Sequence, residues 1–375
     1  MNWSIKLFRV KNIDVRVHTT FVLILIWAAY RWSVSTGEGW MGAIFGIVAT
    51  LLLFVSVTLH EFGHSLQALK FNIPVHDITL MPMGGLARIE EMPKDPGKEF
   101  RIAIAGPLVN FIIAGVLFGI GLLLNTRAII SLDELYSSMG QVSWSGLLAY
   151  LTMTNLLMGL FNLIPAYPMD GGRILRASLA KKLGHSKATS IAVNVGQSLA
   201  LLFGLWGFMS GSYTLVLIAI FVWMGAGQEG KDTVVKNVLS EMKISQAMTR
   251  EPQILRANDS LSKAIDLTLS TSQSDFPVTE WGSNQVVGLL CEKDLLKGLQ
   301  THDQTTPVRE VMRTTFPTAM PEQPLLDAHK NMAKGKIRAM PVVDDESNIV
   351  GLLTITDINE AYRLLSFEQK SKQQA

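Results

Sequence analysis

The sequence predicts a polytopic α-helical membrane domain with six transmembrane helices, followed by an α/β domain built from two similar copies. Charged side chains account for 28 of the first 230 residues but 36 of the last 145. Only the second proportion, about 25%, is usual for a soluble domain. The last part of the chain also repeats one pattern after 63 or 64 residues. We therefore expect the membrane domain at 1–230 and the two copies at 244–300 and 308–366.

Stretches without Asp, Glu, Lys or Arg define the membrane domain, because a transmembrane helix needs about 20 mostly apolar residues. The weakest candidate lies first, and the last uncharged stretch is long enough for two helices joined by a turn at 209–213. The predicted spans are His18–Trp32, Gly39–Leu59, Ile102–Thr126, a helix that begins near Trp144, and two helices within Ala188–Gln228.

Lys and Arg residues gather in alternate connections between these spans. Four precede the first span, five lie in 70–101 and five in 173–187, whereas the other connections hold only Arg31 and Arg127. Basic connections stay on the cytoplasmic side. We expect a multi-pass protein of a prokaryotic cell membrane, in contact with the lipid bilayer, with both termini and the repeated domain in the cytoplasm.

Composition excludes two classes of protein. The net charge of +2 and the lack of a long basic run exclude a nucleic-acid partner. The single cysteine, Cys291, cannot form an internal disulfide, which excludes a disulfide-stapled secreted protein.

The second predicted span ends in the pattern H-E-x-x-H. His60 and His64 are four residues apart, so on a helix their imidazoles lie on one face and can bind a single zinc ion. Glu61 then acts as the general base for the attacking water. Ionisable groups at the end of an uncharged helix are costly and usually functional. We expect one zinc ion per chain.

A catalytic zinc takes three protein ligands, and Asp170 is the candidate for the third. It follows Pro165 and Pro168 at the end of the fourth span, on the same side of the membrane as both histidines. The prolines end the helix, and irregular backbone at membrane depth is tolerated where it lines a cavity. A hydrolytic centre that is open to water needs such a cavity.

Three segments of the membrane domain can be compared with known motifs: His60-Glu61-Phe-Gly-His64, Ala105-Gly106-Pro107-Leu-Val-Asn110, and Asn162-x-x-Pro165 running on to Asp170-Gly-Gly. They resemble the signatures of the site-2 protease family of intramembrane zinc metalloproteases, over about residues 1–230. The resemblance implies that His60, His64 and Asp170 bind zinc and that Glu61 is the general base. It also implies that Asn162 holds the substrate backbone or the oxyanion. Residues 71–91 resemble the family's β-hairpin, which offers an edge to an extended substrate strand.

The two copies in the last part of the chain mix short β runs, such as 286–290, with helical stretches, such as 325–333. Phe276-Pro-Val matches Met340-Pro-Val, and the segment Gly288 to Asp294 matches Gly351 to Asp357. A repeat of this length predicts two α/β units packed as a pair. It resembles a pair of CBS domains, modules that often bind adenosyl ligands in the clefts between them.

In such domains a hydroxyl and a carboxylate bind the ribose of the ligand. Thr354 and Asp357 fit this pattern in the second copy, and a carboxylate is a suitable acceptor for ribose hydroxyls. The first copy has Cys291 in place of the hydroxyl and keeps Asp294. We therefore expect an adenine nucleotide, ATP or AMP, at one site at most. A purely structural pair, or one that joins two chains in a homodimer, stays open.

The favoured function is regulated intramembrane proteolysis, in which a transmembrane protein substrate unwinds and is cleaved at the zinc centre. Adenine nucleotide at the CBS pair is expected to regulate it. The alternative is a CBS-regulated membrane transporter or channel, but a transporter has no need of His60, His64 and Asp170 converging on one side of the membrane. A catalytically inactive scaffold is disfavoured because Glu61 is intact.

Overall fold

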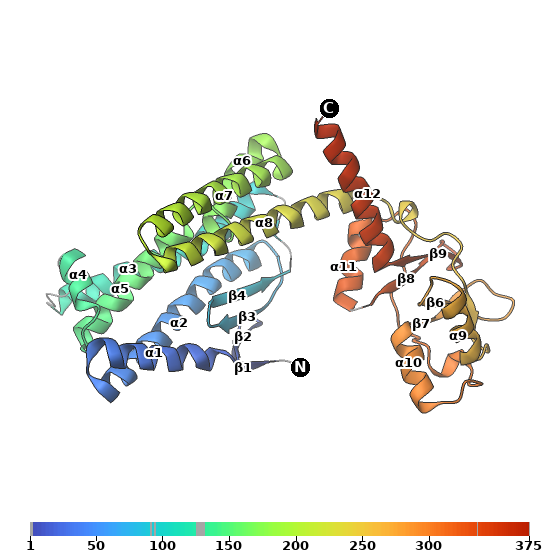
Figure 1. Ribbon diagram of the computed structural model, residues 1–375, viewed down its shortest axis with the longest axis horizontal. Helices are drawn as coiled ribbons and strands as arrows, with labels where there is room; N and C mark the ends of the chain where they lie inside the picture. The colour runs from blue at the N-terminus through green and yellow to red at the C-terminus, as the bar shows by residue number, and fades with distance from the viewer. Residues whose placement is uncertain (1–2, 91, 94, 125–131, 336, 375) are drawn as a thin grey trace. The chain divides into compact units, whose positions relative to one another are not determined.

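The structure is a computed structural model that describes residues 3–90, 92–93, 95–124, 132–335 and 337–374 (Figure 1). The chain divides into two compact units, Met1–Lys231 and Asp232–Ala375. The boundary between them falls inside one helix, α8 (Tyr213–Glu241).

Five helices of the described chain are long and apolar enough to cross a membrane. They are α2 (Gly39–Lys70), α3 (Pro96–Leu123), α5 (Trp144–Asn162), α7 (His185–Met209) and α8. The first predicted span forms a sixth apolar helix, α1 (Phe21–Thr36), of only 16 residues. At 1.5 Å per residue it reaches about 24 Å, short of the roughly 30 Å hydrocarbon core. The predicted helix end at Thr126, and Arg127, lie outside the described residues.

Helix α2 is central to the first unit, because it packs against α1, α3 and α5. Asp95 caps the N-terminus of α3: its carboxylate accepts the backbone N–H groups of Gly97 and Lys98 at 2.7 and 3.0 Å, a usual helix N-cap. Large apolar side chains on α1 and α8 point outward, among them Leu23, Ile26, Trp27, Leu217 and Phe221. Such an outer surface suits contact with lipid.

A four-stranded sheet of order β1-β2-β3-β4 belongs to the same unit. Its strands are β1 (Ser4–Val10), β2 (Ile13–His18), β3 (Val75–Met81) and β4 (Gly84–Ile89). β3 and β4 form the hairpin expected within 71–91, β2 and β3 are parallel, and β4 is an edge strand. Buried Ile13 and Ile78 pack in one core with Phe54 of α2 and Ile102 of α3, so the sheet is fixed against α3 and against α2, the helix that carries both histidines.

The second unit contains the two predicted α/β copies, each with its own apolar core. The first consists of β5 (Leu255–Arg256), α9 (Leu261–Ser270), β6 (Phe276–Thr279), β7 (Val286–Leu290) and α10 (Glu292–Thr301). The second consists of α11 (Leu325–Gly335), β8 (Ala339–Val343), β9 (Ile349–Thr354) and α12 (Ile355–Gln374).

The two copies exchange backbone hydrogen bonds in a symmetric way. Leu289 in β7 pairs with Arg313, near the start of the second copy, at 2.9 and 3.0 Å. Leu352 in β9 pairs with Thr249, near the start of the first copy, with both bonds at 2.9 Å. Arg313 and Thr249 therefore occupy equivalent positions in the two copies.

Candidate metal centre

His60 and His64 lie inside α2, which continues for six residues past His64. Both residues are only 5% exposed, and their Nε2 atoms are 3.1 Å apart. The i, i+4 spacing on a helix produces this convergence, as the sequence predicts.

Asp170 reaches the same point from a different part of the chain. α5 ends at Asn162, an irregular segment contains Pro165 and Pro168, and α6 (Asp170–Leu183) begins with Asp170 itself. Its Oδ2 atom lies 3.1 Å from Nε2 of His64 and 3.3 Å from Nε2 of His60. The three candidate ligand atoms all lie within 4.8 Å of one another.

The segment before Asp170 folds back tightly on the start of α6. A Cβ atom at Gly171 would lie 2.1 Å from the carbonyl oxygen of Ile164, so only glycine fits there. In the second turn of α6, Arg176 is 4% exposed and forms ion pairs with Glu99 at 2.5 Å and Glu229 at 2.6 Å. These contacts fix α6, and with it Asp170, against α3 and α8. From the sequence, Arg176 is only one of five basic residues in 173–187.

Hydrogen bonds on the far side of each imidazole determine where its proton lies. Nδ1 of His64 is 2.7 Å from the backbone carbonyl oxygen of Ile102, which can only accept, so Nδ1 carries the proton. Nδ1 of His60 contacts Oδ1 of Asn110 in the same manner. In the neutral form of each ring, this places the unprotonated Nε2 on the side that faces Asp170. Two nitrogen lone pairs and a carboxylate oxygen at one buried point are the donor set of a zinc site, and the residues fit that metal.

Glu61 lies beside these three side chains and is fixed by a hydrogen bond from the sheet. Its Oε2 atom accepts the backbone N–H of Ala87 in β4 at 3.2 Å. Oε1 makes no hydrogen bond to a described residue. One carboxylate oxygen is therefore anchored and the other is available for a proton.

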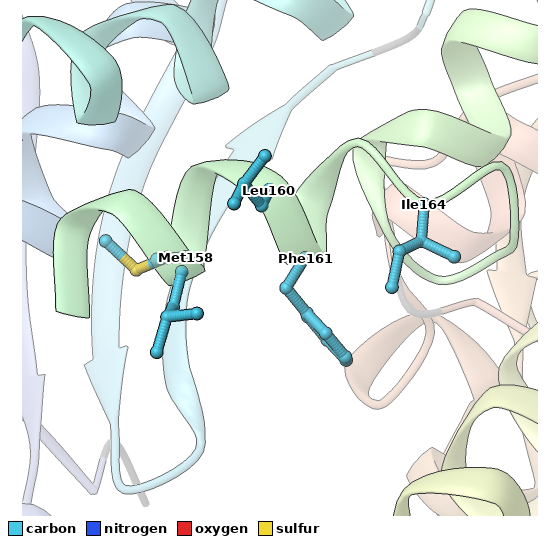
Figure 2. A pocket seen from close by; sticks show the side chains of 5 residues that line it. Met158, Leu160, Phe161 and Ile164 are labelled. Atoms are coloured by element: carbon cyan, nitrogen blue, oxygen red, sulfur yellow. The ribbon is translucent and has the colours of Figure 1, made fainter. Parts of the chain in front are cut away.

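Asn162 is the last residue of α5, and its side chain makes no hydrogen bond within the described part of the chain. No hydrogen bond joins it to His60, His64 or Asp170. An apolar pocket of about 590 Å³ lies along the last turns of α5. Figure 2 shows the side chains that line it, on the helix and on the segment after it: Leu157, Met158, Leu160, Phe161 and Ile164.

The two CBS copies present different surroundings to their matching carboxylates. Oδ2 of Asp357 accepts the backbone N–H and the hydroxyl of Thr354, both at 2.8 Å, while Oδ1 makes no hydrogen bond to a described residue. In the first copy both oxygens of Asp294 are taken by Arg313, at 2.5 and 3.1 Å.

Matches to known protein families agree with the division of the chain into two units. The model of peptidase family M50 matches residues 48–203, and that of the CBS domain matches 244–301 and 308–364. The zinc metalloprotease MJ0392 of Methanocaldococcus jannaschii is 36% identical over 380 residues, which cover 99% of this chain and 100% of that protein. The CBS domain-containing protein YhcV of Bacillus subtilis is 32% identical over 117 residues, which cover 31% of this chain and 81% of that protein. Among solved structures, the site-2 protease of M. jannaschii is 43% identical, covers 61% of this chain and 95% of that chain, and superposes with a TM-score of 0.43.

The match to MJ0392 runs over nearly the whole chain and includes both units. It favours the protease over the alternative of a transporter or channel. The chain belongs to peptidase family M50, the site-2 protease family of zinc metalloproteases, and carries a pair of CBS domains after its apolar helices.

Proposed function

We propose that the chain is an intramembrane protease that binds one zinc ion through His60, His64 and Asp170 and cleaves transmembrane protein substrates. The observation that carries the proposal is the convergence of these three side chains beside Glu61, with both histidines and Glu61 on α2, a helix long enough to span a bilayer. Zinc at this point supplies a Lewis acid for the scissile carbonyl and for water.

Glu61 is the general base in this proposal. The bond from Ala87 to Oε2 fixes the carboxylate, and Oε1 takes the proton of the attacking water. A general base must be held within hydrogen-bond reach of the proton that it removes. The hydrogen bond from the backbone N–H of Ala87 holds Glu61 in one position.

The substrate segment binds as an extended strand along β4. β4 is an edge strand, and the N–H of Ala87 on its open side already points at Glu61. A substrate strand added to this edge would pass Glu61, and the carbonyl groups of the substrate would be accessible to the attacking water. Substrate helices must unwind first, because helical carbonyls are covered by their own hydrogen bonds. In this proposal, the apolar pocket at the end of α5 accepts apolar side chains of the substrate, and Asn162 stabilises the oxyanion.

We propose the topology that the charge distribution predicts, with both termini and the CBS pair in the cytoplasm of a prokaryotic cell. Three basic segments lie before α1, between α2 and α3, and around α6. The positive-inside rule assigns these three segments to the same side, on which Asp170 also lies.

The second CBS copy is the proposed nucleotide site, for ATP or AMP. Asp357 has an oxygen available for a ribose hydroxyl. The residue that pairs with β9 in the way that Arg313 pairs with β7 is Thr249, which is short and neutral. The counterpart of Asp357, Asp294, is neutralised by Arg313. A homodimer formed through the CBS pair is compatible with the same assignment.

α8 connects such a ligand to the metal centre. It is continuous from the first unit to the second, and within the first unit it contacts the segment that bears Asp170. A Cβ at Gly225 would lie 2.6 Å from Cδ of Pro168, and Glu229 pairs with Arg176. A ligand that changes the position of α8 therefore changes the site, provided that it binds one arrangement better than the other.

Metal analysis and proteolysis together test the proposal. Full-length protein purified in detergent should contain one zinc ion per chain and cleave a model transmembrane substrate in liposomes. The double variant His60→Ala, His64→Ala should lose both. Zinc retained at full stoichiometry in the double variant, or a wild-type protein free of zinc, would overturn the assignment of the centre.

A further inference from the structure

A chain of buried amides leads from α5 to His60. Asn155 lies in the middle of α5 and is 0% exposed. Its Nδ2 group donates to the backbone carbonyl of Leu151 at 2.8 Å and to the hydroxyl of Ser56 at 3.1 Å. A carbonyl oxygen can only accept, so the orientation of the Asn155 amide is fixed with Nδ2 toward Leu151.

This orientation fixes the next amide as well. Oδ1 of Asn155 accepts from Nδ2 of Asn110 at 3.0 Å, and Asn110 is also 0% exposed. If Asn110 turned over, two oxygens would meet across 3.0 Å in a buried site, where an unsatisfied polar pair is costly. Oδ1 of Asn110 therefore faces Nδ1 of His60 and accepts its proton.

We propose that Asn155 is a positioning residue that sets the metal affinity of the centre by fixing, through Asn110, the tautomer of His60. With Asn110 held, the proton of His60 stays on Nδ1 and the lone pair of Nε2 faces Asp170. Without Asn155, Asn110 can present its NH₂ group to His60, which favours the tautomer with the proton on Nε2, and that tautomer binds no metal. The inference rests on the proposed zinc centre.

The first experiment measures zinc affinity of full-length protein by competition with a chromophoric chelator. Asn155→Leu, similar in size but without polar atoms, should weaken zinc binding by about 10- to 100-fold, the usual effect of removing an outer partner of a metal ligand. Thr152→Val is the matched control, because Thr152 is also buried in α5 and, among the described residues, its hydroxyl bonds only to the carbonyl of Leu148, at 2.8 Å. It should leave zinc affinity unchanged.

The second experiment repeats the substitution in an Asn110→Asp background. Both oxygens of an aspartate accept, so residue 110 then needs no orientation by Asn155 to receive the His60 proton. Asn155→Leu should cost little zinc affinity there. A merely structural role of Asn155 predicts the same loss in both backgrounds, and that result would overturn the proposal.

The outcomes distinguish the proposed role of Asn155 from the zinc centre itself. A wild-type protein that binds no zinc contradicts the proposed function. Equal zinc affinity in the wild-type and Asn155→Leu proteins contradicts only the proposed role of Asn155. Thermal unfolding of the metal-free forms shows whether each variant folds. Asn155→Ala gives the same comparison if the leucine variant does not fold.

Discussion

Gly106 of α3 lies directly against the ring of His64. A Cβ atom at position 106 would be 2.1 Å from Nε2 of His64 and 2.8 Å from Cε1 of His60. The small residue therefore lets α3 approach α2 closely enough for Ile102 to accept the proton on Nδ1 of His64, at 2.7 Å. This contact gives a physical reason for the glycine in the segment Ala105 to Asn110.

Gly106→Ala should weaken zinc binding by about tenfold to a hundredfold, because a methyl group there must displace the His64 ring and overpacking of this kind costs about 1–3 kcal/mol. Gly119→Ala in the same helix is the control, since nothing lies within 4 Å of a Cβ at that position. Equal zinc content and affinity in the two variants would contradict the close packing of α3 against the histidines.

Glu61→Gln should keep one zinc ion per chain and lose nearly all proteolysis. The amide has almost the shape of the carboxylate and can still accept the N–H of Ala87, but it cannot take a proton from water at neutral pH. Zinc analysis and single-turnover cleavage of a transmembrane substrate check the two parts. Turnover within tenfold of the wild type would remove Glu61 from the role of base.

The sequence alone was enough to predict the candidate ligands that follow helical spacing or that stand out by their charge. His60 and His64 follow from an i, i+4 pattern, and Asp170 follows from its isolation after a long uncharged stretch. The repeated pattern likewise predicted the two α/β copies. Asn162 stays a prediction, because no described contact tests its role.

Other features depend on contacts between distant segments and could not be predicted in the same way. β1 and β2 were missed because their mixed basic and apolar residues resemble the flank of a membrane span, and the parallel pairing of β2 with β3 forms only in the fold. Asn155 follows no motif. A buried asparagine in the middle of a 19-residue apolar helix was nevertheless a usable signal, since polar groups at membrane depth need partners.

Asn162→Ala should slow cleavage about 100- to 1000-fold, roughly 2.7–4 kcal/mol, if its amide stabilises the oxyanion. Zinc binding should not change, because the Asn162 side chain makes no hydrogen bond with the three proposed zinc ligands. Kinetics at saturating substrate, together with zinc analysis, test this expectation. Loss of metal would mean instead that Asn162 supports the segment leading to Asp170.

Cys291 should be almost unreactive in the folded protein. Burial raises the pKa of its thiol to about 12, and the nearby carboxylate of Asp275 acts in the same direction. At pH 8 the reactive thiolate is then on the order of 1 in 10,000 molecules, against about a quarter for an unperturbed thiol. Alkylation by iodoacetamide, followed by mass spectrometry, should be more than 100-fold slower than in urea-unfolded protein. Equal rates would show that the first CBS copy is open around this residue.

The two CBS carboxylates should differ in their contribution to nucleotide binding. Calorimetry of the full-length protein with AMP and with ATP should detect one binding site per chain, and Asp357→Ala should weaken it by about tenfold or more, as expected for the loss of a charged hydrogen-bond acceptor. Asp294→Ala is the matched control. It removes an equivalent carboxylate that Arg313 already neutralises, so the affinity should stay the same.

Asp357 also accepts the backbone N–H of Thr354 at the start of α12, so its loss could act through the helix rather than through the ligand. Asp357→Asn separates the two effects, because an amide oxygen still accepts that N–H while the negative charge is gone. A ribose contact predicts weakened binding in both variants with normal thermal unfolding in the asparagine variant. Equal sensitivity of binding to Asp294→Ala and Asp357→Ala, or no binding at millimolar nucleotide, would leave the CBS pair as a structural or dimerising element.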